Sequence, residues 1–211
     1  MRVFITGGTG LIGRRLMLDR LERGDRITLL SRDEKSARKL FAADANRNIT
    51  VIGGNPATPG SWQKSLAGCD AVIHMAGAGL GDRRWSAAYK RTIVASRIDS
   101  THQVITALEM TPPAQRPRVL INPSAIGYYG NCGEREVHEA SPPGPASDFL
   151  SDLCVKWEQQ ASRARSLGLR VVLSRTGQLS HSWSAGMRDI EAGMAWTDDT
   201  LARIYSMTKP I

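Results

Sequence analysis

A glycine-rich segment near the amino terminus constrains this chain more than any other feature. It runs from Thr6 to Gly13, directly after a short apolar run and directly before a stretch of helical periodicity. Glycines at positions 7, 10 and 13 allow a tight strand-to-helix turn and let backbone N–H groups approach a pyrophosphate. The alternative is a tight turn that holds no ligand. We predict nucleotide binding, with contacts from Gly7, Thr9, Gly10, Leu11, Ile12, Gly13 and Arg14.

The end of the second apolar run bears on the choice of cofactor. Arg32 follows Gly13 by 19 residues, near the place where an NAD-selective site carries an acidic residue for the ribose 2′-hydroxyl. A guanidinium there, with Arg14 inside the first helix, suits a 2′-phosphate. We therefore predict NADP(H) as the cofactor. In the alternative interpretation Arg32 is an exposed loop residue and Asp33 binds the ribose.

Six short apolar runs recur along the chain without polar alternation. They span residues 2–5, 27–30, 49–52, 71–75, 118–121 and 169–173. Continuous runs are typical of strands covered on both faces. Helical periodicity separates them, most clearly over residues 89–108 and 149–161, the latter preceded by Ser147 and Asp148 as a candidate cap. The alternation predicts an α/β fold with a doubly wound, Rossmann-type parallel sheet of about six strands.

A second turn of small residues, Ala76 and Gly77, follows the fourth run. Carboxyl ends of parallel strands share one edge of the sheet, so this turn is expected to let the dinucleotide lie close to the backbone. His74, at the end of the same run, is predicted to be a packing residue rather than a catalyst.

Composition excludes several classes of protein. The chain has 211 residues, 41% hydrophobic and 23% charged, which fits one globular domain. Its net charge of +8 arises in residues 1–100, where 17 Lys and Arg face 9 Asp and Glu. No basic run is interleaved with aromatic residues, so we expect a small-molecule substrate and no nucleic-acid partner.

Cysteine spacing and hydropathy bear on metal sites, disulfides and cellular location. Cys69, Cys132 and Cys154 lie far apart, with no C-x-x-C spacing, so neither a metal site nor a disulfide framework is expected. No apolar run approaches the roughly 18 residues of a membrane-spanning helix. We expect no membrane association and a cytoplasmic location.

Several motifs together resemble the atypical, epimerase-like branch of the extended short-chain dehydrogenases/reductases, sometimes labelled nucleoside-diphosphate sugar epimerases. The most specific is S-A-I-G-Y-Y-G over residues 124–130, and the others lie at 4–13, 76–77, 84–85, 97–101, 148–158 and 175–177. The resemblance covers roughly residues 1–177. It implies an NADP(H)-dependent epimerase or oxidoreductase for a small carbonyl or sugar-nucleotide-like substrate. It also implies Ser124 as the catalytic serine, with Arg32, Ala76, Gly77 and Arg175 at the cofactor.

The chain departs from that superfamily at the proton-transfer pair. The superfamily uses a tyrosine with a lysine four residues later, which lowers the tyrosine pKa. Here Asp152 stands four residues before Lys156, and no tyrosine occurs between Tyr129 and Tyr205. Tyr128 and Tyr129 are candidates for the acid, or else walls of the nicotinamide pocket. We therefore expect impaired catalysis, and a non-catalytic NADP(H)-sensing module is the first alternative function.

Residues 178–211 do not continue the pattern. They resemble the beginning of serine beta-lactamase-like esterases, in which Ser206 and Lys209 would form S-x-x-K. Without the rest of such a fold this pair cannot be preorganised for acyl transfer. A serine hydrolase fragment is thus the second alternative function. We expect an NADP-binding domain over residues 1–177 and a foreign or poorly ordered tail over 178–211.

Overall fold

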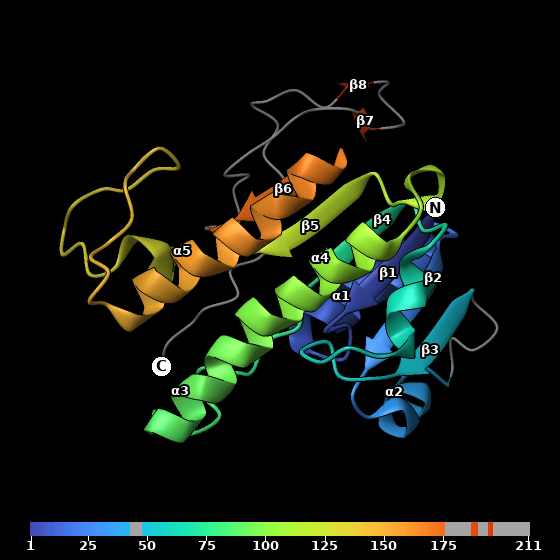
Figure 1. Ribbon diagram of the computed structural model, residues 1–211, viewed down its shortest axis with the longest axis horizontal. Coiled ribbons are helices and arrows are strands. Elements are labelled where there is room, and N and C mark those ends of the chain that lie inside the picture. The colour runs from blue at the N-terminus through green and yellow to red at the C-terminus, as the bar shows by residue number, and fades with distance from the viewer. Residues whose placement is uncertain (43–47, 176–186, 190–193, 196–211) are drawn as a thin grey trace.

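The computed structural model describes residues 1–42, 48–175, 187–189 and 194–195. Its main feature is a six-stranded parallel sheet in the order β3-β2-β1-β4-β5-β6 (Figure 1). The strands are β1 (Arg2–Thr6), β2 (Arg26–Ser31), β3 (Ile49–Gly53), β4 (Ala71–His74), β5 (Val119–Pro123) and β6 (Arg170–Ser174). Each strand lies on one of the six apolar runs, so the predicted Rossmann-type fold is confirmed.

The strand order reverses between β1 and β4. From β1 the chain adds β2 and β3 on one side, then crosses to add β4, β5 and β6 on the other. Thr6, the last residue of β1, pairs with His74, the last residue of β4. In sheets wound this way, ligands bind outside the carboxyl ends at the point of reversal. The ends of β1 and β4 are therefore the first place to look for a site.

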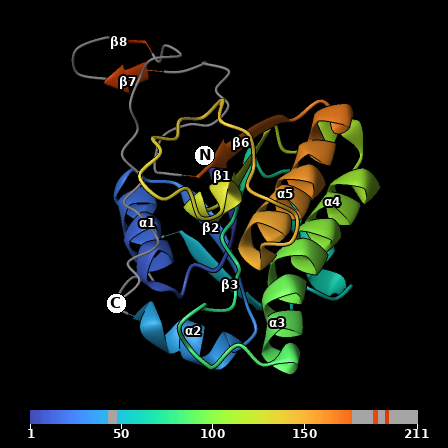
Figure 2. The ribbon, with the colours of Figure 1, turned by 90° about the vertical axis from the view of Figure 1, so that its left-hand side faces the viewer.

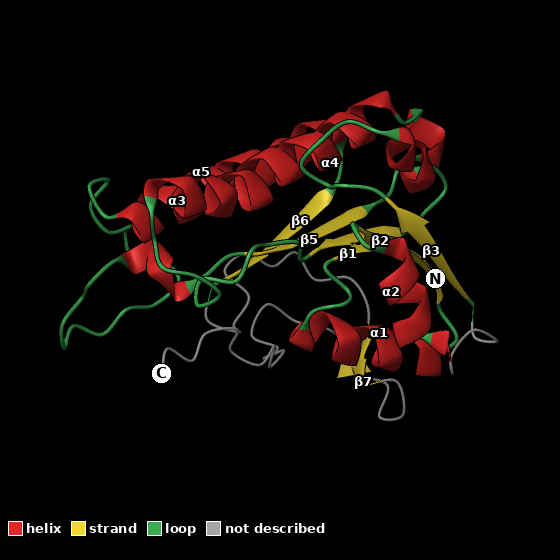
Figure 3. Cartoon of the chain, turned by 90° about the horizontal axis from the view of Figure 1, so that it is seen from below, coloured by secondary structure: helices red, strands yellow, loops and turns green. Residues whose placement is uncertain are grey.

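Helices cover both faces of the sheet. In Figure 3, α1 (Leu11–Glu22) and α2 (Glu34–Leu40) lie on one side, and α3 (Ala87–Val94), α4 (Ser100–Met110) and α5 (Phe149–Ser162) on the other. Figure 2 shows the same two groups with the sheet between them. Asp148 caps α5, because its Oδ1 accepts hydrogen bonds from the Leu150 and Ser151 amides at 2.9 Å. The predicted cap is thus confirmed.

Two apolar cores follow from the alternation of side chains along each strand. Ile5 packs with Met17 and Leu29 beneath α1, whereas its neighbour Phe4 packs with Leu120 on the face that α4 covers. All five of these side chains are fully buried. Adjacent residues of one strand therefore enter opposite cores, which explains why the apolar runs are continuous.

The long helix predicted over residues 89–108 is interrupted by a π-helical turn, Ala95–Asp99, between α3 and α4. The Ser96 hydroxyl donates to the Ile93 carbonyl at 2.9 Å, and the Ser100 hydroxyl donates to the Ser96 carbonyl at 2.6 Å. Such bonds compete with the backbone ladder. Apolar periodicity continues through the turn, so the pattern alone did not reveal it.

In residues 178–211, the described portions are two short strands, β7 (Met187–Asp189) and β8 (Met194–Ala195), which pair antiparallel. Ser206 and Lys209 lie outside the described residues. Across the part of the chain that is described, no helix is both long and apolar enough to cross a bilayer.

Candidate nucleotide-binding site

The glycine-rich turn joins β1 to α1 and packs against the turn after β4. Gly7 has a φ of +72°, and a Cβ there would lie 2.5 Å from the backbone carbonyl of Met75. A Cβ at Gly13 would collide with the Gly7 carbonyl oxygen. A side chain at Gly7 would force the two turns apart, so glycine is required there by both conformation and space. At Gly13 glycine is required by space alone, because a Cβ would enter the glycine-rich turn itself.

The amino terminus of α1 opens at this turn without a side-chain cap. Gly10 is the N-cap and forms no side-chain hydrogen bond, while the Arg14 amide makes the first helical bond, to the Gly10 carbonyl at 2.8 Å. The first amides of a helix have no partner within it and carry partial positive charge. Thr9, Leu11 and Arg14 are exposed around them. This open cradle fits a pyrophosphate group.

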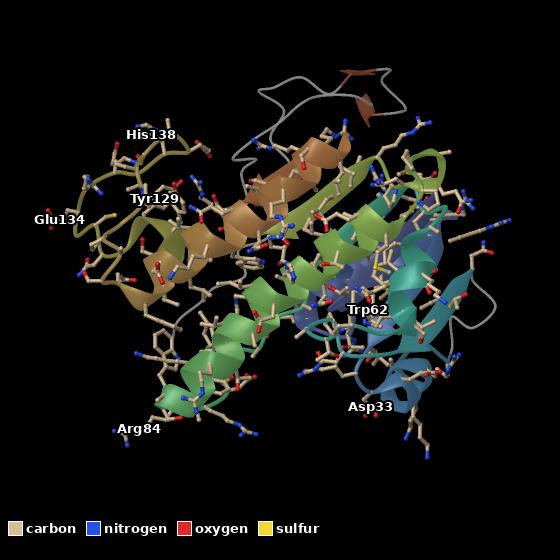
Figure 4. All side chains as sticks on the ribbon, in the orientation of Figure 1. Asp33, Trp62, Arg84, Tyr129, Glu134 and His138 are labelled. Carbon is tan, nitrogen blue, oxygen red and sulfur yellow. The ribbon has the colours of Figure 1, made fainter. Side chains whose placement is uncertain are left out.

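The end of β2 separates the roles of two neighbouring residues. Asp33 is the N-cap of α2, and its Oδ1 accepts a hydrogen bond from the Ser36 amide at 2.9 Å. Hydrogen bonding by Ser36 holds the pKa of the Asp33 carboxyl below its ordinary value. Arg32 is exposed, and its guanidinium has no ion-pair partner in residues 1–42 and 48–175. Figure 4 shows Asp33 at the start of α2.

A buried chain of hydrogen bonds supports the Ala76–Gly77 turn. The Ala76 amide donates to Thr6 Oγ1 at 3.1 Å, and Thr6 Oγ1 lies 2.7 Å from His74 Nδ1. His74 Nε2 lies 3.0 Å from the hydroxyl of Ser100, which donates to a helix carbonyl. Every donor has an acceptor if His74 is neutral with its proton on Nε2, and burial lowers its pKa to about 4. His74 thus packs the strand end, as predicted.

Ser124 follows β5 at the same edge of the sheet. Its amide donates to the Ser174 carbonyl at 2.7 Å, which extends the pairing of β5 with β6. The residue is 6% exposed, and its hydroxyl oxygen has no hydrogen-bond partner among the described residues. The Cys154 thiol lies near it but outside hydrogen-bonding geometry, and burial raises the pKa of that thiol to about 11. A buried hydroxyl without a partner is suited to binding a ligand atom.

Tyr128, Tyr129 and Arg175 form one stacked group beside Ser124. The two rings meet edge to face, and the Arg175 guanidinium carbon lies 3.4 Å from the centre of the Tyr128 ring. Tyr129 is buried and Tyr128 is half-buried. Figure 4 shows Tyr129 where the long loop that carries Glu134 and His138 begins to project from the body. Of the two phenols, Tyr128 is the one that a ligand reaches more easily.

Arg175 is engaged by protein acceptors on all three nitrogens. Nε and one terminal nitrogen each donate to the Glu158 carboxylate at 2.6 Å, and the other donates to the Glu139 carbonyl at 3.1 Å. Burial lowers the pKa of Arg175, but the hydrogen bonds to Glu158 outweigh it and raise that pKa above its ordinary value. The structure therefore places Arg175 as a support for the Tyr128 ring, and its contact with a cofactor stays a prediction.

A model of the NAD dependent epimerase/dehydratase family matches residues 3–186 of this sequence. The chain belongs to this family. The match extends past Gly177, where the sequence analysis ended the first domain, and covers most of the chain.

Curated members of the epimerase family are similar over most of the chain. A chloroplastic epimerase family protein of Arabidopsis thaliana is 34% identical over 84% of this chain and 48% of its own length. An epimerase family protein of Staphylococcus saprophyticus is 34% identical over 83% of this chain and 54% of its own. The chain thus spans about half the length of these relatives.

Solved structures agree on the fold. A human epimerase family protein solved with NADPH is 27% identical with a TM-score of 0.61, covering 84% of this chain and 54% of the other. A nucleoside-diphosphate sugar epimerase of Corynebacterium glutamicum is 27% identical with a TM-score of 0.64, covering 84% and 34%.

Lys156, which has Asp152 four residues before it, does not reach the site. Lys156 is exposed on α5 and pairs with Asp152 through a 2.7 Å contact between Nζ and Oδ2. This is an ordinary ion pair one helical turn apart. Neither side chain contacts Ser124 or Tyr128, so the structure gives Lys156 no part in proton transfer.

Three features of the site were missed by sequence reasoning. Glu158 anchors Arg175, Asp33 caps a short helix, and Arg97 lies beneath the Ala76–Gly77 turn. The cap had a signal, because Asp33 stands directly before Glu34 and a run of good helix formers. The other two depend on contacts between distant segments, which no local pattern encodes.

A hollow lies at the opposite edge of the sheet from the glycine-rich turn. It is lined by the amino ends of β1 and β2 and by the segment before β4, including Arg2, Arg26, Thr28, Ser65 and Cys69. It has no helix amino terminus and lies away from the glycine-rich turn. Ligands of such sheets bind at the carboxyl ends of the strands, so this hollow is not where a nucleotide is expected.

Proposed function

We propose that this chain binds NADP(H) at the carboxyl ends of β1, β2 and β4 and supports hydride transfer to or from a small carbonyl or sugar-nucleotide-like substrate. The observation that best supports NADP(H) lies directly after β2. Asp33 caps α2, while Arg32 beside it has no ion-pair partner in the described residues. A free guanidinium favours a 2′-phosphate over a 2′-hydroxyl. The human relative solved with NADPH supports the same choice.

The chain's own residues divide the binding work among three places. The open amino terminus of α1 accepts the pyrophosphate, with Gly7 and Gly13 keeping the backbone close. Arg32 and Arg14 hold the 2′-phosphate. The Ala76–Gly77 turn, braced by Thr6 and His74, forms the floor beneath the dinucleotide.

The chemistry of the reaction centre is assigned to the cofactor and to two hydroxyl groups. The nicotinamide supplies or accepts the hydride when it is bound. Ser124 donates a hydrogen bond to the substrate oxygen, since its hydroxyl is buried and otherwise unpartnered. Tyr128 exchanges a proton with that oxygen, because it is the more exposed of the two adjacent phenols.

A non-catalytic, NADP(H)-sensing module is the second candidate. One observation favours it: the residue four positions before Lys156 is Asp152 instead of a tyrosine, and the two side chains pair on the surface. A sensor would bind NADPH as tightly as an enzyme does but would turn nothing over.

Fluorescence titration with NADPH and NADH tests the binding proposal. We expect NADPH to bind about tenfold more tightly or better, because charge-assisted bonds to a phosphate are worth about 1.5–3 kcal/mol. Equal affinities would contradict it. Loss of NADPH absorbance with a panel of aldehydes, ketones and nucleotide sugars then separates the enzyme from the sensor.

A further inference from the structure

Arg97 places a positive charge beneath the Ala76–Gly77 turn. Its guanidinium carbon lies 3.3 Å from the position that a Cβ on Gly77 would occupy, and one terminal nitrogen donates to the Ala78 carbonyl at 3.1 Å. The same group lies 5.5 Å from the centre of the Trp157 ring. The side chain is thus fixed at the edge of the sheet where the proposed dinucleotide binds.

No carboxylate neutralises this charge among residues 1–42 and 48–175. The other partly buried arginines are satisfied: Arg175 pairs with Glu158, and Arg116 donates from each of its three nitrogens to a backbone carbonyl. On Arg97 only one terminal nitrogen has acceptors, and Nε and the second terminal nitrogen have none in the described residues. Burial lowers the pKa of Arg97 from its ordinary value. A desolvated cation without an anion is costly to fold around.

The neighbouring side chains do not supply the missing anion. Cys154 and Tyr89 are the titratable groups that act on Arg97. Burial raises the pKa of the Cys154 thiol to about 11, so it is neutral near pH 7, and the Tyr89 hydroxyl donates to the Gly79 carbonyl. The carboxylate of Glu158 is taken by Arg175. In the described residues, Ser124 Oγ is the one side-chain nitrogen or oxygen that is both shielded from solvent and without a hydrogen-bond partner. The two free nitrogens of Arg97 are therefore not shielded, and solvent reaches them.

The backbone around Arg97 is also unusual. Arg97 lies in the π-helical turn Ala95–Asp99, which the hydroxyls of Ser96 and Ser100 stabilise. π-turns inside helices occur often at functional sites, because the extra residue redirects a side chain. Here the turn directs Arg97 toward the Ala76–Gly77 turn, on the side where Cys154 lies near both Arg97 and Ser124.

We infer that Arg97 binds an anionic group, a phosphate or a carboxylate, between the Ala76–Gly77 turn and Ser124. The inference rests on the proposed function in one respect, that the ligand occupies this edge of the sheet. The anion has two possible sources, the pyrophosphate of the cofactor or an acidic substituent of the substrate. Either would pair with the two free donors of the guanidinium fork.

The test compares Arg97→Gln with a matched control, Arg91→Gln, which removes an exposed arginine from the preceding helical turn. Each protein is titrated with NADPH and with 2′,5′-ADP, which lacks the second phosphate of the pyrophosphate. The free and NADPH-loaded proteins are then titrated with inorganic phosphate and with malonate by calorimetry. Melting temperatures confirm that the variants fold.

Two results support the inference and identify the source. If the cofactor supplies the anion, Arg97→Gln lowers the affinity for NADPH by roughly 10- to 100-fold and leaves the affinity for 2′,5′-ADP unchanged. If the substrate supplies it, NADPH affinity is unchanged, and phosphate or malonate binding is lost in Arg97→Gln but kept in Arg91→Gln. Wild-type affinity of Arg97→Gln for all four probes would overturn it.

Failure of the proposed function is seen separately. If the wild-type chain does not bind NADPH, the proposed function fails, while phosphate and malonate titrations of the free chain still decide whether Arg97 binds an anion. If Arg97→Gln does not fold, Arg97→Lys decides instead, because lysine keeps the charge but loses the fork. Several-fold weaker anion binding supports the inference, and unchanged binding overturns it.

Discussion

At the scale of single residues, the proposed preference for NADP(H) depends on Arg32. We expect Arg32→Asp to lower the affinity for NADPH by about 10- to 100-fold without lowering the affinity for NADH. The substitution replaces a cation that would bind the 2′-phosphate with a carboxylate that would repel it. Paired fluorescence titrations measure the ratio. Arg118→Asp, at an exposed arginine of the amino edge, is the control and should keep the wild-type preference. An unchanged ratio in Arg32→Asp would exclude Arg32 from the site.

Comparing Gly7 with Gly24 distinguishes two reasons for a glycine, backbone conformation and lack of space for a side chain. Both lie in the left-handed region, at +72° and +75°, but a Cβ on Gly24 meets nothing within 4 Å, whereas one on Gly7 meets the Met75 backbone. We expect Gly24→Ala to lower the free energy of unfolding by about 1–2 kcal/mol, the cost of the left-handed conformation. Gly7→Ala should lose about 1–3 kcal/mol more, because its Cβ also overpacks the turn. Urea denaturation measures both. Equal losses would mean that the two turns are not in contact.

At the scale of elements, Asp33 distinguishes a helix cap from a ribose ligand. Serine also caps helices, so Asp33→Ser should keep the stability of α2, and Asp33→Ala should lose about 1 kcal/mol. We expect both variants to bind NADPH and NADH within a few-fold of wild type. If NADH binding falls strongly in Asp33→Ser, whose cap is intact, Asp33 binds the ribose and Arg32 does not select the cofactor.

Elements whose signals are local could be predicted from the sequence. The apolar runs located the six strands of the parallel sheet, and Asp148 located the start of α5. Burial on both faces and capping each act over a few residues. The glycine spacing likewise located the turn between β1 and α1. The π-turn at Ala95–Asp99 could not be predicted, since it depends on serine hydroxyls within an unbroken apolar stripe.

Site features that depend on contacts between distant segments could not be predicted from the sequence. Residue types alone did not show that Glu158 would meet Arg175 across 17 positions. Nor did they show that Arg97 would lie beneath Gly77, or that Ser124 would be left without a partner. These contacts form only after the sheet brings the ends of β4, β5 and β6 together.

At the scale of the whole molecule, His74 couples stability to pH. Its folded pKa of about 4 lies below the ordinary value of 6.5, so between these values the unfolded chain binds more protons. Stability is therefore full above pH 6.5 and falls as the pH drops toward 4. The loss is on the order of 3 kcal/mol.

The His74 contribution is measured against a variant that cannot titrate. We expect His74→Gln to be less stable than wild type at neutral pH and to lose less stability on acidification to pH 4. Urea denaturation across this range gives both slopes, and His102→Gln, at an exposed histidine, is the control. Parallel curves for wild type and His74→Gln would show that the buried ring does not stay neutral.

Hydrogen exchange of the chain with and without NADPH tests the location of the cofactor most directly. We expect NADPH to slow exchange of backbone amides over residues 7–14 and 75–78, and to slow it more than NADH does at equal concentration. Peptides covering residues 24–28 and 65–69, at the amino edge, should exchange at unchanged rates. Protection confined to the amino edge, or equal protection by the two dinucleotides, would contradict an NADP(H) site built on the glycine-rich turn and Arg32.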